Sequence, residues 1–137
     1  MSCTFIYKFQ NKLYMLLADN AEIKGMVKKI YIGAVQDGKE PFLLITILSA
    51  KNLSRYKDAI YEVDFQISAY AKDHNHHLLT KLADQVLLAL PEAKRASEGY
   101  SVSGIKVNNI QFEKARNLVL NKLTINCKAL IKQEVYI

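Results

Sequence analysis

The residues best suited to chemistry lie close together, because all three histidines of the chain fall between positions 74 and 77. His74 and His77 would share one face of a helix, and residues three apart on a helix can ligate one metal ion. No cysteine stands near His74, His76 and His77, and Asp73 is the only adjacent carboxylate. We therefore expect a solvated helix start here and keep a metal site as the alternative.

Other catalytic patterns are missing from the sequence. A histidine base would need a nucleophile and an orienting group, and no G-x-S-x-G frame supplies them. The five glycines never cluster as a phosphate-binding loop requires. The carboxylates of Glu62 and Asp64 share one strand face, as polar residues of an exposed face commonly do. The sequence therefore predicts no catalytic residue, no metal ligand and no cofactor, and a protein that binds other proteins.

Charge and cysteine content narrow the class further. The net charge is +6, but the basic residues are scattered in runs of at most two, without the aromatic interleaving of a nucleic-acid surface. A ring through which DNA passes would tolerate the same charge. Cys3 and Cys127 lie far apart, so we expect two reduced thiols in a cytoplasmic protein, with Cys127 buried in a strand.

The length of 137 residues predicts a single domain spanning 1–137. Polar residues interrupt the apolar ones of the first 17 positions. The segment therefore resembles neither a signal peptide nor a membrane span, and we expect no membrane partner.

Period-two alternation predicts two long strands, over 60–71 and 119–131. Apolar residues hold one parity in each. The buried positions predicted in this way are Tyr61, Val63, Phe65, Ile67, Ala69 and Ala71 in the first strand, and Val119, Leu123, Ile125, Cys127, Ala129 and Ile131 in the second.

Between these strands, apolar residues spaced by three and four predict a helix over 76–90. Asp73 or Asn75 is placed to cap its start, and Pro91 blocks its continuation. The same spacing predicts an N-terminal helix over 5–17, and a short helical segment is expected over 21–27.

Three further strands are expected. A strand over 29–34 precedes a turn at Asp37-Gly38. Residues 42–48 are almost continuously apolar, which favours a central strand covered on both faces. The parity of a strand over 105–113 switches at Asn108-Asn109, which predicts a bulge. Surface loops are expected at 49–58 and 92–104.

Together these elements predict an α/β (α+β) fold. It is a two-layer sandwich in which one mostly antiparallel or mixed sheet of about five strands carries two main helices on one face. The other face stays without helices and is either solvated or packed against a neighbouring subunit. The side chains expected on that face are Glu62, Gln66, Ser68, Lys122, Thr124 and Lys128.

The order of segments resembles the tail completion family of long-tailed bacteriophages and gene transfer agents, whose members are tail terminators and head-to-tail joining proteins. The most specific part is the strand YEVDFQISAYAKD at 61–73, which runs directly into the helix LLTKLADQVLLAL at 78–90. A Leu-rich N-terminal helix, IYIG at 30–33 and Pro41-Phe42 complete the match. The chain departs from the family in having no Trp anywhere.

The resemblance implies a structural virion protein made in the bacterial cytoplasm and then built into a tail. It implies a homo-oligomeric ring of about six copies that contacts the tail tube protein and a neck or head-completion protein, with DNA passing through. Another neck or minor tail component remains the alternative. A small metal-dependent enzyme or a nucleic-acid-binding domain is the more distant one.

A partner interface is expected in the loop at 49–58. The loop carries the bulky and mostly cationic side chains of Lys51, Arg55, Tyr56 and Lys57, which neither a tight turn nor a core requires. Tyr100, in the other predicted loop, is a second candidate for an interface anchor.

Overall fold

Nine elements follow one another in the computed structural model, which describes residues 3–36, 38–53, 59–72, 76–94, 99–115 and 120–133. The predicted helices and strands are confirmed, with shifts at their ends. In chain order the elements are α1 (Thr4–Ala18), α2 (Ala21–Met26), β1 (Lys29–Ile32), β2 (Phe42–Asn52), β3 (Ala59–Lys72), α3 (His76–Ala89), the 3-10 turn η1 (Leu90–Lys94), β4 (Tyr100–Ala115) and β5 (Leu120–Gln133).

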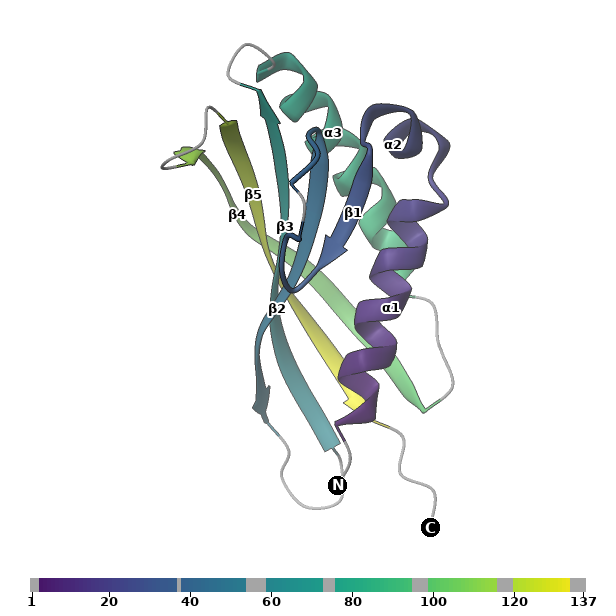
Figure 1. Ribbon diagram of the computed structural model, residues 1–137. Coiled ribbons are helices and arrows are strands. Elements are labelled where there is room, and N and C mark those ends of the chain that lie inside the picture. The colour runs from purple at the N-terminus through teal and green to yellow at the C-terminus, as the bar shows by residue number, and fades with distance from the viewer. Residues whose placement is uncertain are drawn as a thin grey trace.

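The five strands form one mixed sheet in the order β1-β2-β3-β5-β4. Strand β1 pairs with β2 in parallel, and the other three pairings are antiparallel. Figure 1 shows the strongly twisted sheet, with α1, α2 and α3 together on one face of it. The predicted two-layer sandwich with a mixed sheet is therefore confirmed.

The alternation in β3 and β5 decides which face of the sheet meets the helices. Phe65, Ile67, Leu123 and Ile125 are almost completely buried under the helices. Each strand alternates along its length, because successive side chains of a strand point to opposite faces. Every predicted inward residue of these strands that the structure describes is buried, and Val119 lies outside the described residues.

Helix α1 closes the core because four of its apolar side chains recur every fourth residue and face the sheet. Phe5, Phe9, Leu13 and Leu17 are all buried. The ring of Phe9 meets that of Phe65 edge-on, with 5.4 Å between the ring centroids. Offset and edge-on aromatic pairs add about 0.5–1.5 kcal/mol beyond their buried area. This contact therefore helps to hold α1 on the sheet.

Helix caps and turns explain several of the element ends. The Asn20 side chain accepts a hydrogen bond of 3.1 Å from the Ile23 backbone N–H and caps α2. Gly33 has φ +77, a conformation that favours glycine, and β1 ends just before it. Gly38 of the predicted turn has φ +58, whereas Asp37 and the predicted caps of α3 lie outside the described residues. Among the described helices, none has the length and apolar character needed to cross a membrane.

Strand β2 is longer than predicted, which corrects the expectation that a loop begins at Ser49. A register shift between Ile47 and Ser49 marks a bulge, after which Ser49–Asn52 continue to pair with β3. The polar composition of this stretch resembles a loop because its side chains lie on an exposed end of the strand. The expectation that β2 is covered on both faces holds only in part: the described helices lie on one face (Figure 1), and on the other face Phe42 is buried beside Tyr31 and Tyr70.

Strand β4 likewise begins earlier than predicted and takes in part of the expected loop 92–104. Tyr100 is fully buried and meets Phe9 edge-on at 6.4 Å between centroids, so it belongs to the core and is not an exposed anchor. The predicted bulge at Asn108 is confirmed by a register shift between Val107 and Asn109. A second shift, between Val102 and Gly104, was not predicted.

Candidate functional site

The predicted interface loop is only partly described. Lys51 is exposed and lies in β2, where it pairs across the strands with Glu62. Arg55, Tyr56 and Lys57 lie outside the described residues. The proximity of these four side chains therefore stays a prediction.

The histidine cluster is likewise described only in part. His74 and the side chain of His76 lie outside the described residues, and His77 is exposed in the first turn of α3. Within the described part of the chain, no three His, Cys, Asp or Glu side chains gather as metal ligands would. The solvated helix start stays the expectation for this segment.

The two cysteines are separate thiols, as expected. Cys3 is exposed, and Cys127 is buried in β5 on the face that meets the helices. Burial raises the pKa of the Cys127 thiol to about 12, because the thiolate would lose its hydration. A buried, neutral thiol packs as a small apolar group and is a poor nucleophile. Cys127 is therefore a core residue.

The opposite face of the sheet carries a ladder of hydrogen-bonded polar side chains. The Ser68 and Thr124 hydroxyls lie 3.2 Å apart and share a hydrogen bond. Gln66 Nε2 donates to Asn126 Oδ1 at 2.9 Å, and Asn126 Nδ2 donates to Asn109 Oδ1 at 2.7 Å. Because these groups satisfy one another, the centre of this helix-free face is a preorganised surface.

Ser68 and Thr124 are only 2% and 3% exposed, although no helix covers them. In the register of the sheet, Ser68 lies opposite Leu44 and Thr124, and Thr124 also lies opposite Gln111. The expected side chains of the helix-free face are thus in place, but its centre is drier than a solvated sheet face would be.

Charged groups flank this ladder toward one end of the sheet. Lys128 Nζ lies 3.0 Å from Glu62 Oε1 and 4.0 Å from Asp64 Oδ1. The hydrogen bond from Lys128 to Glu62 and the attraction of both carboxylates raise the pKa of Lys128. Ser49 Oγ donates to Asp64 Oδ2 at 3.2 Å. This network fixes side chains that would otherwise move in solvent.

An aromatic cluster occupies the other end of the helix-free face. The rings of Phe42 and Tyr70 stack with 4.6 Å between centroids, and Tyr31 meets Phe42 edge-on at 5.3 Å. Lys122 Nζ lies 5.6 Å from the centroid of Tyr70 and 3.3 Å from Glu113 Oε1. Partial burial alone would lower the pKa of Lys122. Its interactions with Tyr70 and Glu113 outweigh this effect, so the pKa of Lys122 lies above its ordinary value.

The long edge strand β4 exposes two large apolar side chains. Burial on its helix-facing side falls along the strand, from fully buried Tyr100 to Ile110 and Phe112, which are 43% and 57% exposed. Sequence reasoning placed this strand but missed its exposed apolar pair. The alternating pattern of the sequence does place Ile110 and Phe112 on the same face of the strand. Only the strand order shows that this strand is an edge of the sheet, where the two side chains stay exposed.

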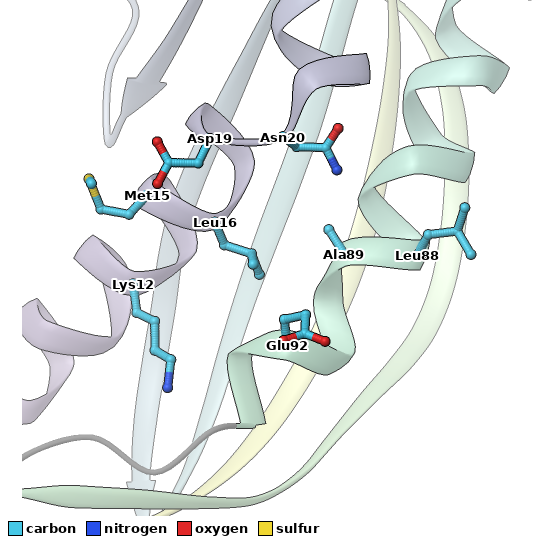
Figure 2. A pocket seen from close by; sticks show the side chains of 8 residues that line it. All are labelled: Lys12, Met15, Leu16, Asp19, Asn20, Leu88, Ala89 and Glu92. Atoms are coloured by element: carbon cyan, nitrogen blue, oxygen red, sulfur yellow. The ribbon is translucent and has the colours of Figure 1, made fainter.

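A shallow hollow of about 540 Å³ lies between α1 and α3 on the outer side of the helix layer. Figure 2 shows Met15 and Leu16 of α1 on one side of it and Leu88 and Ala89 of α3 on the other. Leu88 is 72% exposed. The remaining lining residues are Lys12, Asp19, Asn20 and Glu92. Four apolar side chains line this hollow and none of its described lining residues is Ser, Thr, Cys or His, so it suits an apolar side chain of another protein.

Comparison with known families adds independent information. A family model described as "Tail completion protein gp17" matches residues 11–132. No curated protein matches the sequence.

Two solved structures share the fold at low sequence identity. One is a chain of the "Virion of native gene transfer agent (GTA) particle", with a TM-score of 0.71, 17% identity, and coverage of 90% of this chain and 93% of that one. The other is the "Structure of bacteriophage SPP1 gp17 protein", with a TM-score of 0.53, 15% identity, and coverage of 93% and 88%. At these identities the likeness concerns the fold.

Proposed function

Because the chain belongs to the tail completion protein gp17 family, we propose that it forms a ring that closes the head-proximal end of a phage-type tail and joins it to the neck. Family membership makes the chain a structural tail completion protein of a virion. The observation that carries this conclusion is the family match, which extends over residues 11–132 and so includes β1 to β4 and all but the last residue of β5. The ring, the position in the particle and the partners below are the proposal.

The partners in this proposal are further copies of the chain, the tail tube protein and a neck or head-completion protein. The chain assembles in the bacterial host cytoplasm before it becomes part of the tail. Among the described strands, β1 and β4 are the edges of the sheet, and an edge strand can extend its sheet by pairing with a strand of a neighbour, which supports self-association. When one edge of each copy contacts the other edge of the next copy, the copies form a ring if the rotation from one copy to the next adds up to a full turn.

The helix-free face is the candidate lining of the ring's lumen. Strand pairing places seven lysines and three carboxylates on it, a net charge of +4 that favours non-specific contact with passing phosphates. The lysines are Lys29, Lys51, Lys72, Lys106, Lys122, Lys128 and Lys132. The carboxylates are Glu62, Asp64 and Glu113. Because several of these lysines already face carboxylates or aromatic rings, the contact with DNA is weak and permits sliding.

The loop that carries Arg55, Tyr56 and Lys57 contacts a neighbouring subunit or the next ring of the particle in this proposal. Exposed Lys51 at the end of β2 supports this placement, because it continues the loop's positive charge onto the sheet. The protein works by binding alone and catalyses no reaction. The description of the family as a tail completion protein supports that assignment.

The proposed function is tested by removing the gene from cells that produce the particles and restoring it on a plasmid. Without the chain, electron microscopy should show unjoined heads and tails of irregular length, and the plasmid should restore joined particles. A gold-labelled, tagged chain should mark the head-proximal end of the tail. Joined particles of normal tail length in the absence of the chain would refute the proposal. Label found elsewhere on the neck or tail would favour another neck or minor tail component.

A further inference from the structure

The free edge of β4 changes character along its length. Register shifts next to Val102 and Val107 disturb its first part, and bulges of this kind protect an edge strand from pairing. From Asn109 to Ala115 the pairing with β5 is unbroken, so the outer edge of this segment is regular. Ile110 and Phe112, the exposed apolar pair, lie in this regular segment. The part of the edge best suited to pairing is therefore also the part with the most uncovered apolar surface.

The opposite edge, β1, lies in the same rows of the sheet as this segment. The strand registers connect residues across all five strands, and side chains of one row point to the same face. One row is Ile110, Ile125, Ile67, Ile45 and Ile32, and the next is Phe112, Leu123, Ala69, Leu43 and Ile30. Residues 110–113 of one edge thus stand level with residues 32–29 of the other.

Strand directions at the two edges are also compatible. Strand β1 runs parallel to β2, and the three remaining pairings are antiparallel, so β1 and β4 run in opposite directions. A neighbouring copy that continues the sheet beyond β4 would bring in its β1 antiparallel to β4. Antiparallel strands can form evenly matched hydrogen-bonded pairs without a crossover connection.

We propose that β4 residues 110–113 of each copy pair antiparallel with β1 residues 32–29 of the next copy, which makes the sheet continuous around the ring. The proposal rests on the ring of the proposed function and names its interface. Phe112 then faces Ile30 of the next copy, and Ile110 faces Ile32, on the side of the helices. On the helix-free side, Glu113 faces Lys29, which is exposed and whose Nζ lies 5.1 Å from the centroid of Tyr31 in its own chain.

Helix placement supports a second copy as the partner. Helix α1 contacts β1 and β2, so the helix layer extends to the β1 edge, where Figure 1 shows α1 and α2 beside β1. Tyr100 at the start of β4 packs against Phe9 of α1, but the main contact of β4 with the described helix layer is the short turn η1 near that same end. In the proposed contact, the next copy's α1 and α2 supply the missing cover for Ile110 and Phe112. Because the matched residues share rows, their side chains meet on the same faces of the extended sheet, and the rotation between copies decides whether such contacts close into a ring.

Charge reversal tests the pairing. Lys29→Glu places two carboxylates at each interface, and Glu113→Lys places two ammonium groups there. Each single variant should remain folded by circular dichroism and assemble about five-fold more weakly at each interface. An equimolar mixture of the two variants restores opposite charges at every interface of an alternating ring. Native mass spectrometry of the mixture should therefore show even-numbered rings that contain both variants.

Cross-linking provides a second test that does not depend on charge. In a Cys3→Ser background, the pair Ile30→Cys and Phe112→Cys should be joined between copies by mild oxidation or a short bismaleimide, giving a ladder up to the closed ring. The control pair, Ile30→Cys with Lys106→Cys, places the second thiol in a distant row of β4 and should give little product.

The outcomes separate the interface from the proposed function. Two results would overturn the interface alone. In the first, wild-type rings form but positions 30 and 112 do not cross-link above the control. In the second, the two charge variants do not restore each other's assembly. A purified chain that stays monomeric at high concentration also overturns the interface, even if labelled chain marks the tail end. Cross-linked rings that never locate to a tail end overturn the proposed function and leave the interface intact.

Discussion

Phe65 and Phe112 are two phenylalanines on the helix-facing side of the same sheet, and replacing each with alanine separates core packing from edge exposure. Phe65 is completely buried in the central strand β3, between Ile47 of β2 and Cys127 of β5 and beneath Phe9 of α1. Phe112 is 57% exposed on the edge strand β4. The side chain removed is the same in both variants, so the difference between them reports the environment.

The expected loss for Phe65→Ala is large. At about 25 cal/mol per Å², the lost apolar burial of a phenyl group costs roughly 2–3 kcal/mol, and the remaining cavity brings the total to about 3–5 kcal/mol. The aromatic contact with Phe9 should appear as a coupling of about 0.5–1.5 kcal/mol in a double-mutant cycle with Phe9→Ala. Phe112→Ala should change the monomer's free energy of unfolding by no more than about 0.5 kcal/mol.

Urea denaturation followed by circular dichroism, at concentrations where the chain is monomeric, measures both free energies of unfolding. The m-value should stay constant, so that the midpoint reports stability. A loss below about 1 kcal/mol for Phe65→Ala, or an equal loss for Phe112→Ala, would refute the assignment of faces. The stronger change Phe65→Asp buries a charge at a cost of several kcal/mol and should prevent folding. A soluble Phe65→Asp protein with a cooperative melting transition would contradict the same assignment.

Three further predictions concern groups outside this core. Replacing the three histidines together by glutamine should leave both the melting temperature and the metal content of the purified protein unchanged, and loss of a stoichiometric metal would contradict the assignment as a protein without catalysis. Arg55→Glu with Lys57→Glu should leave the circular dichroism spectrum native but abolish ring formation or tail joining. The control variant Lys81→Glu with Lys94→Glu makes the same change of charge at exposed positions elsewhere and should assemble normally. If the loop variant also assembles fully, the loop is only a solvated turn. The folded-state pKa of Cys127, raised to about 12, means that stability should be fully present below the ordinary thiol pKa of about 8.5 and fall as the pH rises toward 12. Urea midpoints measured against pH should show this fall in the wild type and a smaller one in Cys127→Ala.

The helices and the central strands could be predicted because their patterns are local. The parity of β3 and β5 and the spacing of three and four in α1 and α3 indicate which side of each element is apolar, whatever its neighbours are. Strand ends were harder to place. Ser49–Asn52 and Ser101–Gly104 have the composition of loops, yet they stay in the sheet because neighbouring strands pair with them.

The buried position of Tyr100 illustrates the same limit. A tyrosine next to glycine and serine reads as a loop residue, and only the arrival of β4 beneath α1 turns its ring into the core beside Phe9. The polar ladder shows the converse. Ser68 and Thr124 were correctly assigned to the helix-free face, but their burial was not predicted, because it depends on which strands lie beside them in the sheet.

The sequence by itself determined the type of each element, the face that each strand turns to the helices and the resemblance to the tail completion family. These properties follow from periodicity, which short segments express without knowledge of the rest of the chain. Only the tertiary structure decided that β5 lies between β3 and β4, that β1 and β4 are the edges, and that Ile110 and Phe112 stand level with Ile32 and Ile30. Strand order and register depend on pairing between residues far apart in the chain. The free energy of that pairing comes from cross-strand contacts and a shared core, which no local pattern records.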